Sequence, residues 1–79
     1  MINIFISVRS EVLIKFGEKV REKRTKMSLS QEELAERAGV HRTYIGMIER
    51  AEKNITLENI EKISKALKSP LHELLNFDR

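Results

Sequence analysis

Apolar residues recur at helical spacing along most of the chain. The first amphipathic segment, which we expect to be a helix from about Ser10 to Lys26, has a stripe formed by Val12, Phe16 and Val20. Residues four apart lie on the same face of a helix, so this stripe should face the core. A second face carries lysines that we expect to point to solvent or to phosphate: Lys15, Lys19, Lys23 and Lys26.

The second predicted helix begins at a capping box. Ser30 can accept a hydrogen bond from the backbone N–H of Glu33, and the Glu33 side chain can reach back to the backbone of Ser30. Gly39 is expected to end this helix in the left-handed conformation. Only Val40 and His41 follow before the next helical pattern.

The third predicted helix runs from about Arg42 to Arg50, with Ile45 and Ile48 facing inward. His41 is its expected N-cap. A helix, a short turn with glycine and a second short helix are the organisation of a helix-turn-helix.

Two further helices are expected near the C-terminus. The fourth begins at Thr56 and has an apolar stripe of Ile60, Ile63 and Leu67, and the fifth begins at Ser69-Pro70. Five helices in 79 residues predict a compact all-α domain, which we place at residues 9–79. Residues 1–8 fit either an extended N-terminal arm or an additional frayed helical turn.

Composition excludes several classes of protein. The chain has no cysteine, so it has neither a disulfide framework nor a thiolate metal site, and this fits a cytoplasmic location. No apolar run approaches the roughly 18 residues of a membrane span, so we expect no membrane partner. Residues 9–26 contain seven basic and three acidic residues, which favours nucleic acid as a partner, although a solvated helix also has charged faces.

The stretch SQEELAERAGVHRTYIGMIER resembles the helix-turn-helix of the lambda repressor and Cro family. Gln31 opens the first helix of the motif, Ala35 is small where two helices cross, and Gly39 turns the chain. NITLENIEKISKALKSPLHELL is similar to the fourth and fifth helices of that family. The resemblance implies a five-helix, lambda-repressor-like DNA-binding domain whose second and third helices form the helix-turn-helix.

Within this family, HRTYIGMIER followed by NITLENIEKI is similar to the controller proteins of restriction–modification systems. The similarity implies a sequence-specific transcriptional regulator, a homodimer on an inverted-repeat operator, that autoregulates and controls the endonuclease gene. Many relatives have glycine after the Glu-Arg pair, where this chain has Ala51. Asn54 is therefore an alternative to Ala51 for the left-handed residue of that turn.

The resemblance places the N-terminal part of the third helix in the major groove, against base edges. The residues at these positions are Arg42, Thr43, Gly46 and Met47. Arg42 can donate two hydrogen bonds to guanine, Thr43 offers a hydroxyl and a methyl, and Gly46 allows close approach. Arg42 could instead be an ordinary surface arginine in an ion pair, and Met47 could pack against the protein.

Contacts to the DNA backbone are expected from a second group of residues. Gln31 lies at a helix N-terminus, where backbone N–H groups can hold phosphate, and Tyr44 resembles a controller-protein tyrosine that touches the backbone. Alternatively, Gln31 only favours helix formation and Tyr44 is a half-buried packing residue. The remaining candidates are Arg24, Arg50, Lys53 and Asn54.

Other side chains lack a chemical role. Glu49 is interpreted as structural, in a pair with Arg37 or Arg50, and neither His41 nor His72 has a partner that suggests a metal site or a general base. The chain also lacks a glycine-rich phosphate loop and a paired carboxylate constellation. We therefore expect no enzyme activity, no catalytic residue, no metal and no cofactor.

The C-terminal helix is the predicted dimer interface. Leu71, Leu75 and Phe77 exceed what the core of so small a domain can bury, although Phe77 could instead fold back onto the first helix of a monomer. Glu32 and Glu36 match acidic positions through which the lambda repressor touches RNA polymerase, but ordinary solvated glutamates would look the same. An alternative function for the same fold is a protein-interaction module, such as an antitoxin or anti-repressor.

Overall fold

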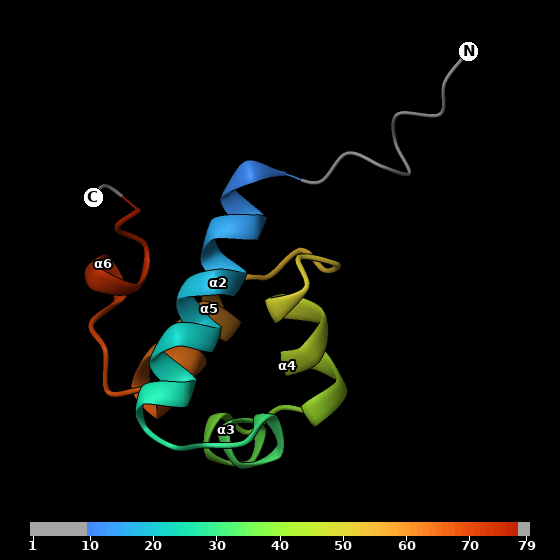
Figure 1. Cartoon of the computed structure of the whole chain (residues 1–79), viewed down its shortest axis with the longest axis vertical. Helices are drawn as coiled ribbons and strands as arrows, with labels where there is room; N and C mark the ends of the chain where they lie inside the picture. Colours follow the sequence, from blue (N-terminus) through green and yellow to red (C-terminus); the bar gives the residue numbers. More distant parts are fainter. Residues whose placement is uncertain (1–9, 78–79) are drawn as a thin grey trace.

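The computed structural model describes residues 10–77, and this part of the chain contains five helices and no strand (Figure 1). In chain order they are α2 (Glu11–Lys26), α3 (Gln31–Ala38), α4 (Arg42–Glu49), α5 (Leu57–Ala66) and α6 (Leu71–Leu74). The predicted all-α fold of five helices is confirmed. Residues 1–8, for which an arm or an additional helical turn is expected, lie outside the described residues.

The predicted caps position α3 and α4. The Ser30 hydroxyl accepts from the backbone N–H of Glu33 at 3.0 Å, and the Glu33 carboxylate accepts from the backbone N–H of Ser30 at 2.8 Å. Gly39 ends α3 with φ 74°, in the left-handed region. Nδ1 of His41 accepts from the backbone N–H of Thr43 at 3.0 Å and starts α4. The capping box, the glycine and the histidine cap are therefore confirmed.

In the turn after α4, the left-handed residue is Ala51 and not the alternative, Asn54. Ala51 itself adopts the left-handed conformation, with φ 60°. Asn54 is not among the residues with positive φ in the described chain, so the hypothesis that it replaces glycine there is wrong. The buried methyl group of Ala51 is retained in a conformation that glycine would adopt with less strain.

One apolar core joins all five helices. Phe16 and Val20 of α2 are buried in it, as predicted, but Val12 is 54% exposed, so its placement in the core stripe is wrong. The first turns of α2 project past the helices that cover the rest of it (Figure 1). The core also contains residues from the other helices and the loops: Leu29, Leu34, Ala35, Ala38, Ile45, Ile48, Ile60, Ile63, Ala66, Leu67 and Leu74.

The C-terminal helix α6 is a single turn that begins after Pro70. It packs on α2 and α5, and it lies on the other side of α2 from α4 (Figure 1). Lys23 of α2, which we expect to face solvent or phosphate, instead binds Glu73 of α6 with an Nζ–Oε2 distance of 2.9 Å. Among residues 10–77, no helix has the length and apolarity to cross a membrane.

Candidate nucleic-acid interface

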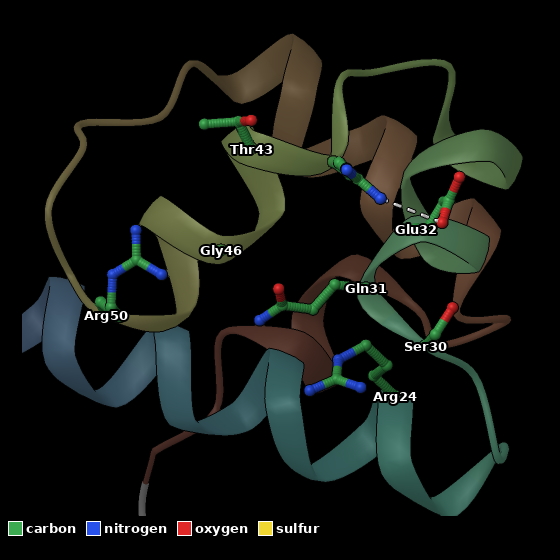
Figure 2. Close-up of a pocket in the computed structure, with 8 residues that line it drawn as sticks. Arg24, Ser30, Gln31, Glu32, Thr43, Gly46 and Arg50 are labelled. Atoms are coloured by element: carbon green, nitrogen blue, oxygen red, sulfur yellow. Dashed lines mark hydrogen bonds and ion pairs between the residues drawn. The ribbon is translucent and has the colours of Figure 1, made fainter.

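An open hollow of about 570 Å³ lies between the N-terminus of α3 and one face of α4 (Figure 2). Six of the ten residues predicted to contact DNA line it: Arg24, Gln31, Arg42, Thr43, Gly46 and Arg50. Ser30 and Glu32 complete the lining. The fold therefore brings together residues from α2, α3 and α4 that are up to 26 positions apart in the sequence.

The first turn of α4 presents the expected base-reading side chains to solvent. Arg42 and Thr43 are exposed, whereas Gly46 is buried and Met47 is half-buried. A Cβ atom at Gly46 would lie 3.1 Å from Nη1 of Arg50 and 3.4 Å from Oε1 of Gln31. The missing side chain therefore makes room for the ends of two polar side chains that line the same hollow.

A buried carboxylate holds the three helices of this surface together. The Glu49 side chain has no solvent exposure, and its oxygens accept from Nε of Arg24 at 2.6 Å and from Nη2 of Arg24 at 3.0 Å. They also accept from Nε2 of Gln31 at 3.0 Å and from Nε of Arg21 at 3.4 Å. Glu49 is structural, but the expected partners Arg37 and Arg50 are wrong. The carboxylate points across the helix packing to α2, and neither to Arg37 of α3 nor to the adjacent Arg50.

The ionisation of Glu49 reflects this environment. Burial alone would raise the pKa of the Glu49 carboxyl, because it penalises the charged form. Hydrogen bonds from Arg24 and Gln31, with the charge of Arg24, outweigh burial, so the pKa lies below its ordinary value. The carboxylate is therefore charged at neutral pH and orders the donors around it.

Arg24 and Gln31 use different parts of their polar groups in this cluster. The Arg24 side chain is only 13% exposed, and besides its two bonds to Glu49 it donates from Nη1 to the carbonyl oxygen of Leu29 at 2.8 Å. Gln31 gives one N–H to Glu49, and its Oε1 stays on the side of Gly46. In Figure 2 the Gln31 side chain lies between Arg24 and Arg50. Arg24 is placed to orient Gln31 through their shared partner Glu49. Gln31 and Arg50 line the open hollow, and Nε of Arg50 also lies 3.1 Å from Oε1 of Glu52.

The remaining backbone-contact candidates lie outside the lining of this hollow. Tyr44 is half-buried against the core, and its hydroxyl accepts from Nδ2 of Asn59 at 3.0 Å, so part of its role is packing. Lys53 and Asn54 are exposed in the loop after α4. Contact of all three with DNA stays a prediction.

The residues predicted to contact another subunit or RNA polymerase differ in their exposure to solvent. Leu71 and Leu75 are exposed by 38% and 37%, while Phe77 packs against the core and lines a hollow along α2. Phe77 thus lies back against its own α2, which is the position expected for it if the protein were a monomer. Glu32 and Glu36 are both exposed on α3.

Sequence reasoning missed the role of Gly17 in positioning α4. A Cβ atom at Gly17 would overlap the carbonyl oxygen of Ile48 and would lie 2.9 Å from that of Glu49. The signal was a glycine in the middle of an otherwise helical pattern, which often marks close packing.

Comparison with known proteins identifies the family of the chain. The helix-turn-helix family matches residues 20–74. The control protein C.BamHI of Bacillus amyloliquefaciens is 49% identical over 69 residues, which cover 86% of this chain and 85% of the relative.

Two solved structures resemble the fold closely. The restriction–modification controller protein C.AhdI from Aeromonas hydrophila has a TM-score of 0.77 and 47% identity, over 78% of this chain and 94% of that one. SinR, a master regulator of biofilm formation solved in complex with DNA, has a TM-score of 0.74 and 35% identity, over 77% of this chain and 98% of that one. The chain therefore belongs to the helix-turn-helix family of DNA-binding transcriptional regulators, which includes the controller proteins of restriction–modification systems.

Proposed function

We propose that this regulator is a restriction–modification controller protein that binds an inverted-repeat operator as a homodimer. The observation that carries the proposal is the hollow between α3 and α4, in which the exposed first turn of α4 adjoins the N-terminus of α3. A single surface thus offers groups that suit base edges and groups that suit phosphate. Identity with C.BamHI of 49% favours control of an endonuclease gene and of the regulator's own gene.

In this proposal α4 lies in the major groove. Arg42 donates two hydrogen bonds to a guanine, Thr43 contacts a neighbouring base, and Met47 meets a thymine methyl. Gly46 allows close approach while it accommodates the ends of Arg50 and Gln31. One good arginine–guanine pair contributes about 1–3 kcal/mol of discrimination against the wrong base.

Phosphate groups are held around this helix. The free backbone N–H groups at the start of α3 and the Gln31 amide bind one phosphate. Arg50, Lys53, Asn54 and Tyr44 bind others and fix the register of α4 on the duplex. Arg24 acts indirectly, because its guanidinium is engaged by Glu49 and Leu29.

The dimer is formed through α6, with Leu71 and Leu75 at its centre and Phe77 supporting them from the core. A two-fold axis buries the same patch of both subunits, and it places two copies of α4 about 34 Å apart, in successive major grooves. Glu36, together with Glu32, is a candidate contact for RNA polymerase on the solvent side of α3.

Selection from a pool of random DNA duplexes tests the proposal directly. We expect an enriched sequence with two inverted half-sites and, by sedimentation equilibrium at tens of micromolar, a dimer that Leu71→Asp/Leu75→Asp converts to a folded monomer. Arg42→Ala should cost about 1–3 kcal/mol on the selected duplex and much less on random DNA. Arg42→Lys keeps the charge but loses the planar fork, so it should resemble Arg42→Ala.

Failure would take a recognisable form. If selection enriches no sequence and the protein does not bind duplex DNA at low salt, the fold serves instead as a protein-interaction module, such as an antitoxin or anti-repressor. A wild-type protein that remains monomeric would remove the dimer while leaving DNA binding intact.

A further inference from the structure

The guanidinium proposed to read a guanine already has a partner. Nη1 of Arg42 in α4 lies 3.2 Å from Oε1 of Glu32 in α3, and the dashed line in Figure 2 marks this ion pair. Both residues line the hollow of the candidate interface. The side chains are 64% and 71% exposed, so the pair is accessible to DNA from solvent.

We propose that Glu32 is a specificity-determining residue, whose carboxylate competes with DNA for the Arg42 guanidinium. The inference rests on the proposed function, because it requires Arg42 to read a base. On a DNA site without the guanine, Arg42 stays with Glu32 and contributes little. On the operator, two hydrogen bonds to guanine replace the ion pair.

The geometry supports exchange. Recognition of guanine needs two N–H groups on one edge of the guanidinium, and the pair with Glu32 occupies Nη1. An exposed ion pair is weak, so a guanine in good geometry can displace the carboxylate. A phosphate can also accept two hydrogen bonds from Arg42, but it brings a full negative charge up to Glu32, whereas the guanine edge is neutral. Loss of the ion pair costs the same on either duplex, so this repulsion is what makes Glu32 disfavour the contact with phosphate more than the contact with guanine.

The position of Glu32 also lowers affinity, equally for the operator and for other DNA. The N-terminus of α3 attracts phosphate through its backbone N–H groups, and a carboxylate in that first turn reduces the attraction. The cap of α3 does not require Glu32, because Ser30 and Glu33 form the capping box. Glu32 can therefore be changed without removal of the hydrogen bonds that start the helix.

Binding to two duplexes separates specificity from affinity. Fluorescence anisotropy at one salt concentration would measure the dissociation constants for the selected operator duplex and for a scrambled duplex of equal length and composition. Glu32→Gln should tighten binding to the scrambled duplex more than to the operator, so that the ratio of the two constants falls about two- to fivefold. Glu36→Gln removes one negative charge from the same helix and should shift both constants equally.

The same measurements in an Arg42→Ala background show whether Glu32 acts through Arg42. There, Glu32→Gln should leave the ratio unchanged. If Glu32→Gln and Glu36→Gln have the same effect on the ratio in the wild-type background, Glu32 is only a negative charge and the proposal is overturned, while base reading by Arg42 stands. If Arg42→Ala weakens both duplexes equally, base reading itself fails and the role of Glu32 fails with it.

Discussion

Substitution of Gly17 by alanine tests the packing of α2 against α4. On helix propensity alone, Gly→Ala in a helix interior stabilises a protein by about 1 kcal/mol. Here the new Cβ atom would overlap the carbonyl oxygen of Ile48 and crowd that of Glu49. Both are backbone atoms, so no side-chain rotation relieves the contact and the two helices must separate.

The expected cost follows from these opposing effects. Overpacking of a core costs about 1–3 kcal/mol, and rigid backbone neighbours place this site at the upper end. Separation of α2 from α4 also lengthens the Arg24–Glu49 hydrogen bonds, the shortest of which is 2.6 Å. We therefore expect Gly17→Ala to lower the free energy of unfolding by about 1–2 kcal/mol, or the melting temperature by about 4–16 °C.

Gly46→Ala is the matched control, because it adds the same methyl group to a helical glycine of the partner helix α4. Its Cβ would meet only the ends of the Arg50 and Gln31 side chains, which can move. Its stability should equal or exceed that of the wild type, while operator binding weakens as those two side chains are displaced. Circular dichroism at 222 nm, with heat and with urea at one protein concentration, measures both variants. A Gly17→Ala protein as stable as Gly46→Ala would refute the close-packing argument.

Three further predictions concern charge and backbone conformation. The folded pKa of Glu49 lies below its ordinary value, so its contribution to stability is complete above pH about 4.3 and is lost as the pH falls through the lowered pKa. The urea midpoint of Glu49→Gln should therefore fall less between pH 6 and pH 3 than the midpoint of the wild type. Equal falls in the two midpoints would contradict this. Lys68 is exposed with φ 54°, so Lys68→Gly should raise the free energy of unfolding by about 1 kcal/mol in the same melts, whereas Lys68→Ala should change it little. Operator affinity should fall with salt with a slope of about −0.9 in log K against log salt for each phosphate bound, and Arg50→Ala should reduce that slope by about one such step; a salt-independent affinity would remove the phosphate contacts.

Features set by nearest neighbours in the chain could be predicted from the sequence. The capping box of Ser30 and Glu33, the left-handed Gly39 and the histidine cap of α4 each depend on a few consecutive residues, and all three are as expected. The family pattern also predicted that α3 and α4 form a helix-turn-helix, and this motif fixes the relation of the two helices between which the hollow lies.

Features set by packing between distant residues could not be predicted. Glu49 finds Arg24 and not its neighbour Arg50, since the partner depends on which face of α2 crosses α4. Val12 shares a helical stripe with Phe16, but periodicity does not show where the covering helices end. Phe77 likewise packs against the core, although the small size of the domain suggested that the core could not bury it.

The buried Glu49 cluster has a consequence for how this class of surface changes over time. Because one carboxylate joins α2, α3 and α4 from beneath, the frame that holds the recognition helix does not depend on the exposed side chains of its first turn. Arg42 and Thr43 can therefore be replaced with little loss of fold, while Arg24 and Glu49 cannot. If these two residues read bases as proposed, a duplicated copy of the gene could acquire a new operator by changes that begin at those solvent-facing positions, and a designer would begin there to redirect the protein to a chosen DNA sequence.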